Sequence, residues 1–199
     1  LILSSGDKDL NNTPGWHHRP RTGEVVWVSD LQAIRHFWFQ MLMGDGVDNI
    51  KGIPKLPPWI CLKYGVSRAG VGKGSAKTLM ATTVAEEDAE QLAYQLYLEW
   101  GHMEGLSEEL VKEYILEQGQ LLWMVRELDD SGNPIMWQIN EAIYEKARQA
   151  VEHFNLQEED GGSGGGEANR GNPYSTEEWE DGDTQRSGDS LRIKPSGHR

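Results

Sequence analysis

The spacing of apolar residues over the first 43 positions predicts two short strands followed by a helix. Leu1-Ile2-Leu3 is a short apolar run, typical of a buried strand in a parallel sheet. Residues 24–28 are a second strand candidate. Ser29 or Asp30 can cap a helix that runs to about Met43, because apolar residues recur there at helical spacing (Leu31, Ile34, Trp38, Met41 and Leu42). We therefore expect α/β structure over residues 1–43.

Residues 44–156 show mainly helical periodicity. Helices are predicted over 75–82, over 86–100, from Ser107 through Val125, and from the capping Asn140 to about Phe154. The helix at 86–100 carries one apolar face (Ala89, Leu92, Ala93 and Leu96). A strong turn signal at 129–134 and a short strand over 135–139 precede the last helix. Most of the tryptophans fall at helical or strand spacing and are expected in the core.

Residues 157–199 differ in composition from the rest of the chain. They contain the run Gly161-Gly162-Ser163-Gly164-Gly165-Gly166, followed by acidic and polar residues with few apolar anchors. Such a segment cannot bury enough apolar surface to offset its conformational entropy. We expect a disordered acidic tail, which agrees with a hydrophobic content of only 37% for the whole chain.

Composition excludes several classes of protein. A single cysteine rules out an intramolecular disulfide framework and a zinc site built from cysteines. The sequence has neither an apolar run near the roughly 18 residues of a membrane span nor a secretory leader, so we expect a cytoplasmic protein. Because the chain opens inside the apolar run at Leu1, we also expect it to be a piece of a longer protein.

Charge is distributed unevenly along the chain. The net charge of −13 argues against a nucleic-acid partner for the chain as a whole. Residues 51–77, however, contain no acidic residue and carry Lys51, Lys55, Lys63, Arg68, Lys73 and Lys77. This stretch fits a polyanion such as DNA, because each cation near a phosphate releases condensed counterions. A solvated loop with ordinary surface lysines remains the alternative.

Four aspartates stand out by their position. Asp7 and Asp9 follow the first strand, and Asp45 and Asp48 follow the helix that ends near Met43. Ligands at the carboxyl end of a parallel strand occupy the usual site of an open α/β sheet. Clustered carboxylates repel one another, and a hard cation such as Mg²⁺ removes that repulsion and can assist phosphodiester hydrolysis. Ordinary turn chemistry is the alternative for each pair taken alone.

Two glycine-containing segments form a second candidate site. They are Gly52-Ile53-Pro54 and Gly70-Val71-Gly72-Lys73-Gly74-Ser75-Ala76, the second at the entry to a helix. Glycines let the backbone approach a phosphate, and a helix N-terminus offers unpaired N–H groups. This chemistry suits a hairpin that grips a DNA backbone without reading bases. The spacing excludes both a Walker P-loop and a dinucleotide-binding fingerprint.

Three motifs in this order resemble the 5′-nuclease family, which includes flap endonucleases and the 5′–3′ exonuclease domain of bacterial DNA polymerase I. The motifs are Ser5-Gly6-Asp7-Lys8-Asp9-Leu10, residues 42–54 (LMGDGVDNIKGIP), and Gly70-Val71-Gly72 with Ala76. Residues 105–126 further resemble the exonucleases of short-tailed coliphages. The resemblance covers roughly residues 1–156.

The resemblance implies a divalent-metal phosphodiesterase acting on duplex DNA with a 5′ end or flap. Asp7, Asp9, Asp45 and Asp48 match the family residues that hold one of two Mg²⁺ or Mn²⁺ ions. A helix–three-turn–helix element would bind the duplex backbone, sometimes with K⁺ held by hairpin carbonyls. By position its DNA-binding residues are Lys51, Gly52, Ile53, Gly70, Gly72, Lys73 and Lys77. A phage-encoded protein of this kind would act in the host cytoplasm.

The sequence departs from the family pattern in two ways, which bear on the expected activity and on the DNA-binding hairpin. The family carries its other metal carboxylates in a preceding half, so residues 1–43 resemble the C-terminal part of a PIN-like α/β core. We expect that half to be supplied in cis or in trans, and the isolated chain to cleave poorly. Residues 55–69 also interrupt the hairpin. The alternative function is a non-catalytic helix-hairpin-helix module that binds DNA and uses its aspartates structurally.

Overall fold

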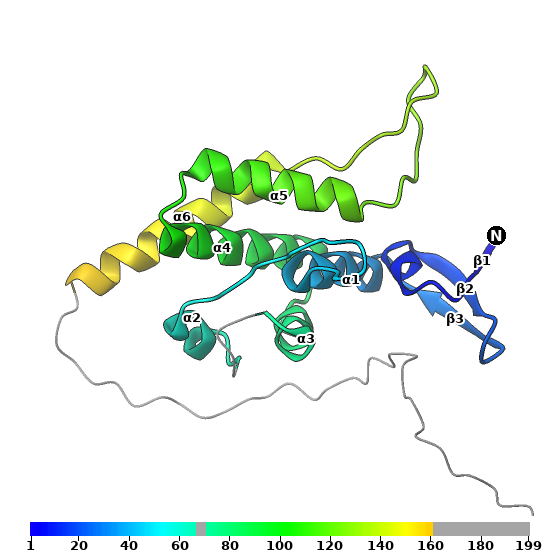
Figure 1. Ribbon diagram of the computed structural model, residues 1–199, viewed down its shortest axis with the longest axis horizontal. Coiled ribbons are helices and arrows are strands. Elements are labelled where there is room, and N and C mark those ends of the chain that lie inside the picture. The colour runs from blue at the N-terminus through cyan, green and yellow to red at the C-terminus, as the bar shows by residue number, and fades with distance from the viewer. Residues whose placement is uncertain (67–70, 161–199) are drawn as a thin grey trace, which may run out of the picture. The chain divides into compact units, whose positions relative to one another are not determined.

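The chain is a mixed α/β structure in its computed structural model, which describes the backbone of residues 1–66 and 71–160 and the side chains up to residue 152. The strands are β1 (Ile2–Ser4), β2 (Gly15–Arg19) and β3 (Glu24–Val28), with a 3₁₀ helix, η1 (Lys8–Asn12), between the first two. The α-helices of the described residues are α1 (Asp30–Met43), α2 (Pro58–Lys63), α3 (Lys73–Ala81), α4 (Glu86–Glu104), α5 (Glu108–Leu122) and α6 (Glu141–Asp160) (Figure 1).

The three strands form one small sheet in the order β1-β2-β3. β1 pairs in parallel with β2, and β2 pairs antiparallel with β3 through a tight connection. The prediction of strands at 1–3 and 24–28 is confirmed, whereas β2 was not predicted. The expected burial of the first strand is wrong, since Ile2 is 55% exposed and its row neighbours Trp16 and Trp27 are also exposed. No layer of the described chain covers this face.

Helix α1 forms where the sequence places it. Ser29 caps it by accepting a hydrogen bond from the Gln32 amide, and the Gln32 side chain accepts from the Ser29 amide in return. This capping box satisfies two amides at the start of the helix that would otherwise lack partners. Gly44, with a positive φ of 76°, ends α1 because it takes a conformation that residues with a Cβ avoid.

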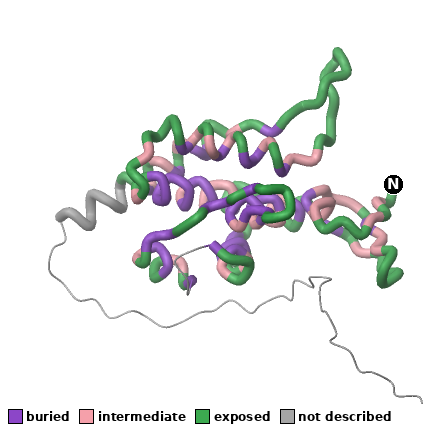
Figure 2. The backbone as a smooth tube through the Cα atoms, viewed as in Figure 1, coloured by how far each residue is buried: buried purple, intermediate pink, exposed green. Residues whose placement is uncertain are grey.

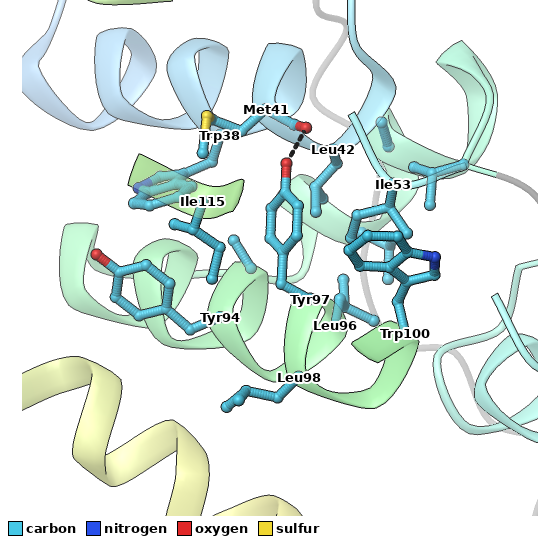
Figure 3. Close-up of a cluster of buried hydrophobic side chains, with 14 of the residues drawn as sticks. Trp38, Met41, Leu42, Ile53, Tyr94, Leu96, Tyr97, Leu98, Trp100 and Ile115 are labelled. Carbon is cyan, nitrogen blue, oxygen red and sulfur yellow. Dashed lines mark hydrogen bonds between the residues drawn. The ribbon is translucent and has the colours of Figure 1, made fainter. Parts of the chain in front are cut away.

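The hydrophobic core lies where α1 faces α4, with α5 and α6 also packed on α4 and α3 packed on α1. Figure 2 shows buried positions concentrated along α1 and α4, while the connection between α5 and α6 is largely exposed. Trp38 meets Tyr94 edge-on at 5.2 Å between ring centroids. The Tyr97 hydroxyl donates a 2.6 Å hydrogen bond to the Met41 carbonyl and fixes the two helices to each other (Figure 3).

The connection between α5 and α6 differs from the prediction. The turn over 129–134 is present, but residues 135–139 form no strand, because their backbone has no neighbouring strand to pair with among the described residues. Packing of side chains fixes this segment instead, with the Trp137 ring seated against Gly119 of α5. Asn140 starts α6 as predicted, by accepting from the Ile143 amide.

The later elements also refine the predicted boundaries. α6 continues to Asp160 instead of ending near Phe154, so residues 157–160 of the expected tail belong to a helix. Residues 161–199 lie outside the described residues, and the expected disorder stays a prediction. α2 was not predicted and falls inside the stretch 55–69. Among the described helices, none combines the length and the apolar character needed to cross a bilayer.

Candidate metal centre

Asp9 reaches its position through the chain that leaves β1. Asp7 caps η1 by accepting a 3.0 Å hydrogen bond from the Asp9 amide, so the two aspartates have different roles. The Asp9 carboxylate then accepts a 2.6 Å hydrogen bond from Gln40 Nε2 of α1. Asp9 is thereby fixed to the buried Gln40 near the end of α1, while the Asp7 side chain stays exposed and serves the local turn.

Asp45 and Asp48 lie on a closed turn that follows α1. Asp45 and Ile50 exchange two backbone hydrogen bonds of 2.8 Å, which close the turn. Asp45 is only 4% exposed, and its Oδ1 accepts from the Val47 amide at 2.9 Å. Gly44 and Gly52 cross so closely at the base of the turn that a Cβ on Gly52 would stand 2.4 Å from the Gly44 nitrogen. The crossing therefore requires glycine at both positions.

The structure brings three of the four predicted aspartates together. One carboxylate oxygen from each of Asp9, Asp45 and Asp48 lies within 4.8 Å of the others. No other set of three or more acidic, histidine or cysteine side chains within the described residues comes this close. Asp7 is not a member of the group. Residues far apart in the sequence thus converge where η1 packs against α1.

Lys8 compensates part of the negative charge of this cluster. Its Nζ lies 3.0 Å from Asp45 Oδ2, and this hydrogen bond lowers the pKa of the Asp45 carboxyl and raises the pKa of the Lys8 ammonium. Asp9 behaves differently, because burial, followed by the nearby Asp7 charge, raises the pKa of its carboxyl. Three carboxylates share one nearby lysine in this cluster, and for Asp9 burial is the main reason that its charged form is disfavoured.

The donor set suits a hard divalent cation. All three ligand atoms are carboxylate oxygens, which Mg²⁺ and Mn²⁺ accept. Around one octahedral Mg²⁺ ion with bonds of about 2.1 Å, adjacent oxygens are roughly 3.0 Å apart and opposite oxygens roughly 4.2 Å apart, so three oxygens that lie within 4.8 Å of one another are near enough to be drawn onto one ion by small side-chain movements. Gln40, whose Nε2 donates to Asp9, has a buried Oε1 that accepts no hydrogen bond within the described residues. This amide oxygen is a further hard donor near the three carboxylates.

Residues 51–53 of the predicted DNA-binding set form backbone hydrogen bonds within the protein. Gly52 and Ile53 are buried. The Gln118 side chain of α5 accepts from the Lys51 and Gly52 amides at 3.0 and 3.4 Å, and the Ile53 amide donates to the Leu42 carbonyl. The Lys51 side chain is exposed. In this arrangement Lys51 presents a charge to solvent, while the amides of 51–53 hold the turn in place.

The carbonyl of Gly52 is engaged as well. It accepts a 2.8 Å hydrogen bond from the Tyr114 hydroxyl of α5. The K⁺ site implied by the resemblance would draw on carbonyls of this hairpin, and Gly52 already gives one lone pair to the tyrosine. The K⁺ assignment stays a prediction.

The second half of the set lies at the start of α3. Gly72 is the N-cap residue, Lys73 opens the helix, and Lys77 follows one turn later. No side chain caps α3, because the N-cap residue is Gly72 and has no oxygen that could accept from the first amides of the helix, as a serine or an aspartate would. Gly72 and Lys73 are exposed, and Lys77 is partly buried. Gly70 lies outside the described residues.

Several positioning residues were not singled out from the sequence. Gln40 orients Asp9, Lys8 pairs with Asp45, and Gln118 with Tyr114 ties the turn after α1 to α5. Gln40 had a detectable signal, because it is a polar residue among the buried positions of α1. Buried polar side chains need hydrogen-bond partners, and such a residue beside a candidate site is a candidate for orienting it.

No protein-family model, no curated protein and no solved structure matches the chain.

Proposed function

We propose that this chain is the C-terminal portion of a 5′–3′ exonuclease or flap-type nuclease that hydrolyses DNA with divalent-metal assistance. The observation that carries the proposal is the convergence of Asp9, Asp45 and Asp48 from two distant parts of the sequence. The order of the motifs, which resembles the 5′-nuclease family, supports the same function. The acid-free basic stretch that follows Asp48 in the sequence supplies charge complementary to a polyanion.

The chain's own residues would act by holding and orienting. Asp9, Asp45 and Asp48 would bind Mg²⁺ or Mn²⁺, and Gln40 would keep the Asp9 carboxylate turned toward the cluster. Such an ion, when bound, neutralises phosphodiester charge and activates water or stabilises a leaving oxygen. Lys8 would keep Asp45 ionised, since its hydrogen bond favours the charged carboxylate. Asp7 would contribute by capping η1 and so placing Asp9.

DNA would be held by charge at the segment that follows the metal centre. Lys51, Lys73 and Lys77 are the lysines of the predicted interface, with Gly72 allowing backbone approach at the α3 N-terminus. These contacts would grip phosphates and carry no base specificity. The remaining metal carboxylates would come from a preceding half in cis or in trans, so the isolated chain is expected to bind DNA better than it cleaves it.

The proposal predicts metal binding that depends on the cluster. Mn²⁺ affinity of the chain is to be measured by electron paramagnetic resonance of free Mn²⁺, with Asp45→Asn and Asp48→Asn as test variants and Asp129→Asn as the matched control. Asp129 also accepts hydrogen bonds within a turn, but it lies outside the cluster. Loss of a cluster carboxylate should weaken Mn²⁺ binding by about tenfold or more. Equal affinity in the test and control variants would reject the metal site.

Cleavage is tested with both halves present. In a polypeptide or complex that includes the preceding half, Asp45→Asn should abolish Mg²⁺-dependent release from a labelled 5′ end, and Asp129→Asn should not. Unchanged cleavage by Asp45→Asn would remove this residue from the reaction.

A second function has one observation in its favour. Lys8 already compensates Asp45, so part of the cluster can be stable without a metal ion. A non-catalytic helix-hairpin-helix module would use the aspartates in this structural way. Such a module should bind duplex DNA equally well with chelator and with Mn²⁺, and should show no cluster-dependent Mn²⁺ binding.

A further inference from the structure

The stretch that interrupts the predicted hairpin folds into a defined element. Pro57 and Pro58 start α2, where a proline in the first turn is favourable because its missing N–H has no helical partner. Leu56, Ile60 and Cys61 are buried in the main core and anchor this element. α2 is therefore held against the helices on one side and presents its other side to solvent, on the same side of α1 as α3 (Figure 1).

The exposed side of α2 carries a lysine whose position is restricted. Lys63 Nζ lies 5.7 Å from the Trp59 ring centroid and 5.1 Å from that of Tyr64. The Tyr64 hydroxyl donates a 3.2 Å hydrogen bond to Gln95 of α4, which fixes the ring that the ammonium lies over. A lysine held by two rings loses less side-chain entropy when it binds a phosphate than an unrestrained lysine does.

The sequence stretch that contains α2 favours an anionic partner by its charge. No acidic residue occurs between Asp48 and Glu86, a range that includes Lys55, Lys63, Lys73 and Lys77. Lys112 on α5 also lies over a tyrosine ring, at 5.1 Å from Tyr144, and it pairs with Glu141 at 2.5 Å. The same kind of aromatic contact thus occurs within a sequence stretch that has no acidic residue and, on α5, beside Glu141.

We propose that Lys63, held on Trp59 and Tyr64, is a phosphate-contacting point for duplex DNA that is separate from the α3 contact. The inference rests on the DNA binding proposed above. It assigns a function to residues 55–66, which extend the electrostatic footprint beyond Lys73 and Lys77 to an additional backbone phosphate. Because Lys63 would contact phosphate only, its contribution should be independent of DNA sequence.

The test is fluorescence anisotropy of a labelled 20-base-pair duplex with the full chain in chelator, titrated over a range of KCl concentrations. Lys63→Gln should weaken binding by about fivefold near 0.1 M salt and reduce the slope of log K against log salt by about 0.9, the value for one lost phosphate contact. Lys63→Arg should keep both the affinity and the slope. Lys112→Gln is the matched control and should match the wild type, with circular dichroism confirming that each variant is folded.

A paired variant separates failure of this inference from failure of the proposed function. If Lys73→Gln/Lys77→Gln weakens binding while Lys63→Gln and Lys112→Gln leave affinity and slope at wild-type values, the α2 contact is refuted and the DNA-binding function stands. If the wild-type chain binds the duplex no more tightly than it binds an uncharged control polymer, both are refuted. A Lys63→Gln effect equal to that of Lys112→Gln would likewise overturn the contact.

Discussion

Replacing Gly44 with alanine tests whether the glycine crossing determines the geometry of the candidate metal centre. Gly44 has φ 76° and ψ 177°, a region that is essentially restricted to glycine. Forcing an alanine into it costs roughly 1–3 kcal/mol. The added Cβ would also lie 2.4 Å from the Ile50 oxygen and 2.6 Å from the Lys51 carbonyl carbon. These are backbone atoms and cannot rotate away, so relief requires movement of the turn that carries Asp45.

The expected loss of stability follows from the two effects together. Overpacking of this kind costs about 1–3 kcal/mol, so Gly44→Ala should lower the free energy of unfolding by roughly 2–6 kcal/mol. That is a large fraction of the ~5–15 kcal/mol that stabilises a typical domain. Because the turn must shift, Mn²⁺ affinity at the cluster should fall as well.

Gly46→Ala is the matched control. Gly46 lies in the same turn, but a Cβ there would meet no atom within 4 Å and its φ is not positive, so stability should change by less than about 0.5 kcal/mol. Urea unfolding followed by circular dichroism measures both variants. If Gly44→Ala were as stable as Gly46→Ala, the glycine crossing would not constrain the turn and the reasoning would be wrong.

Three further predictions concern the scaffold. Ser29→Ala removes one of the two hydrogen bonds of the α1 capping box and should lower the free energy of unfolding by about 1 kcal/mol in urea melts; an unchanged midpoint would contradict the capping role. Gly119→Ala would place a Cβ 2.2 Å from the Trp137 ring and should destabilise by about 1–3 kcal/mol, with a loss of near-ultraviolet dichroism from displaced aromatic rings; a native spectrum would argue against that contact. Burial raises the pKa of Glu90, which accepts a hydrogen bond from the Tyr94 hydroxyl, so its stabilising contribution is present below the unfolded pKa and lost as pH rises through the folded one. Glu90→Gln should therefore raise the melting temperature more at pH 7 than at pH 4, and a pH-independent difference would refute this.

Much of the scaffold could be predicted from local sequence signals. The capping signals at 29–30 and at Ser107 and the apolar spacing in 31–42 and 86–100 led to helices that the structure contains, and the predicted turn at 129–134 is present as well. These signals work because each depends on hydrogen bonds and side-chain spacing within a few residues. β2 escaped prediction, since its consecutive polar residues His17 and His18 lack the alternation that marks a strand, and pairing with β1 and β3 defines it instead.

The sequence by itself determined which residues offer metal-binding chemistry, because aspartates after a strand and in a glycine turn are visible in one dimension. Tertiary structure alone decided which of those aspartates join the cluster and which does not. Asp7 turns back to cap its own 3₁₀ helix, while Asp9 is drawn toward α1 by Gln40 and meets Asp45 and Asp48. The difference has a physical reason: a cap forms between neighbours in the chain, whereas a cluster of like charges forms only where packing of distant segments and a compensating cation make it stable.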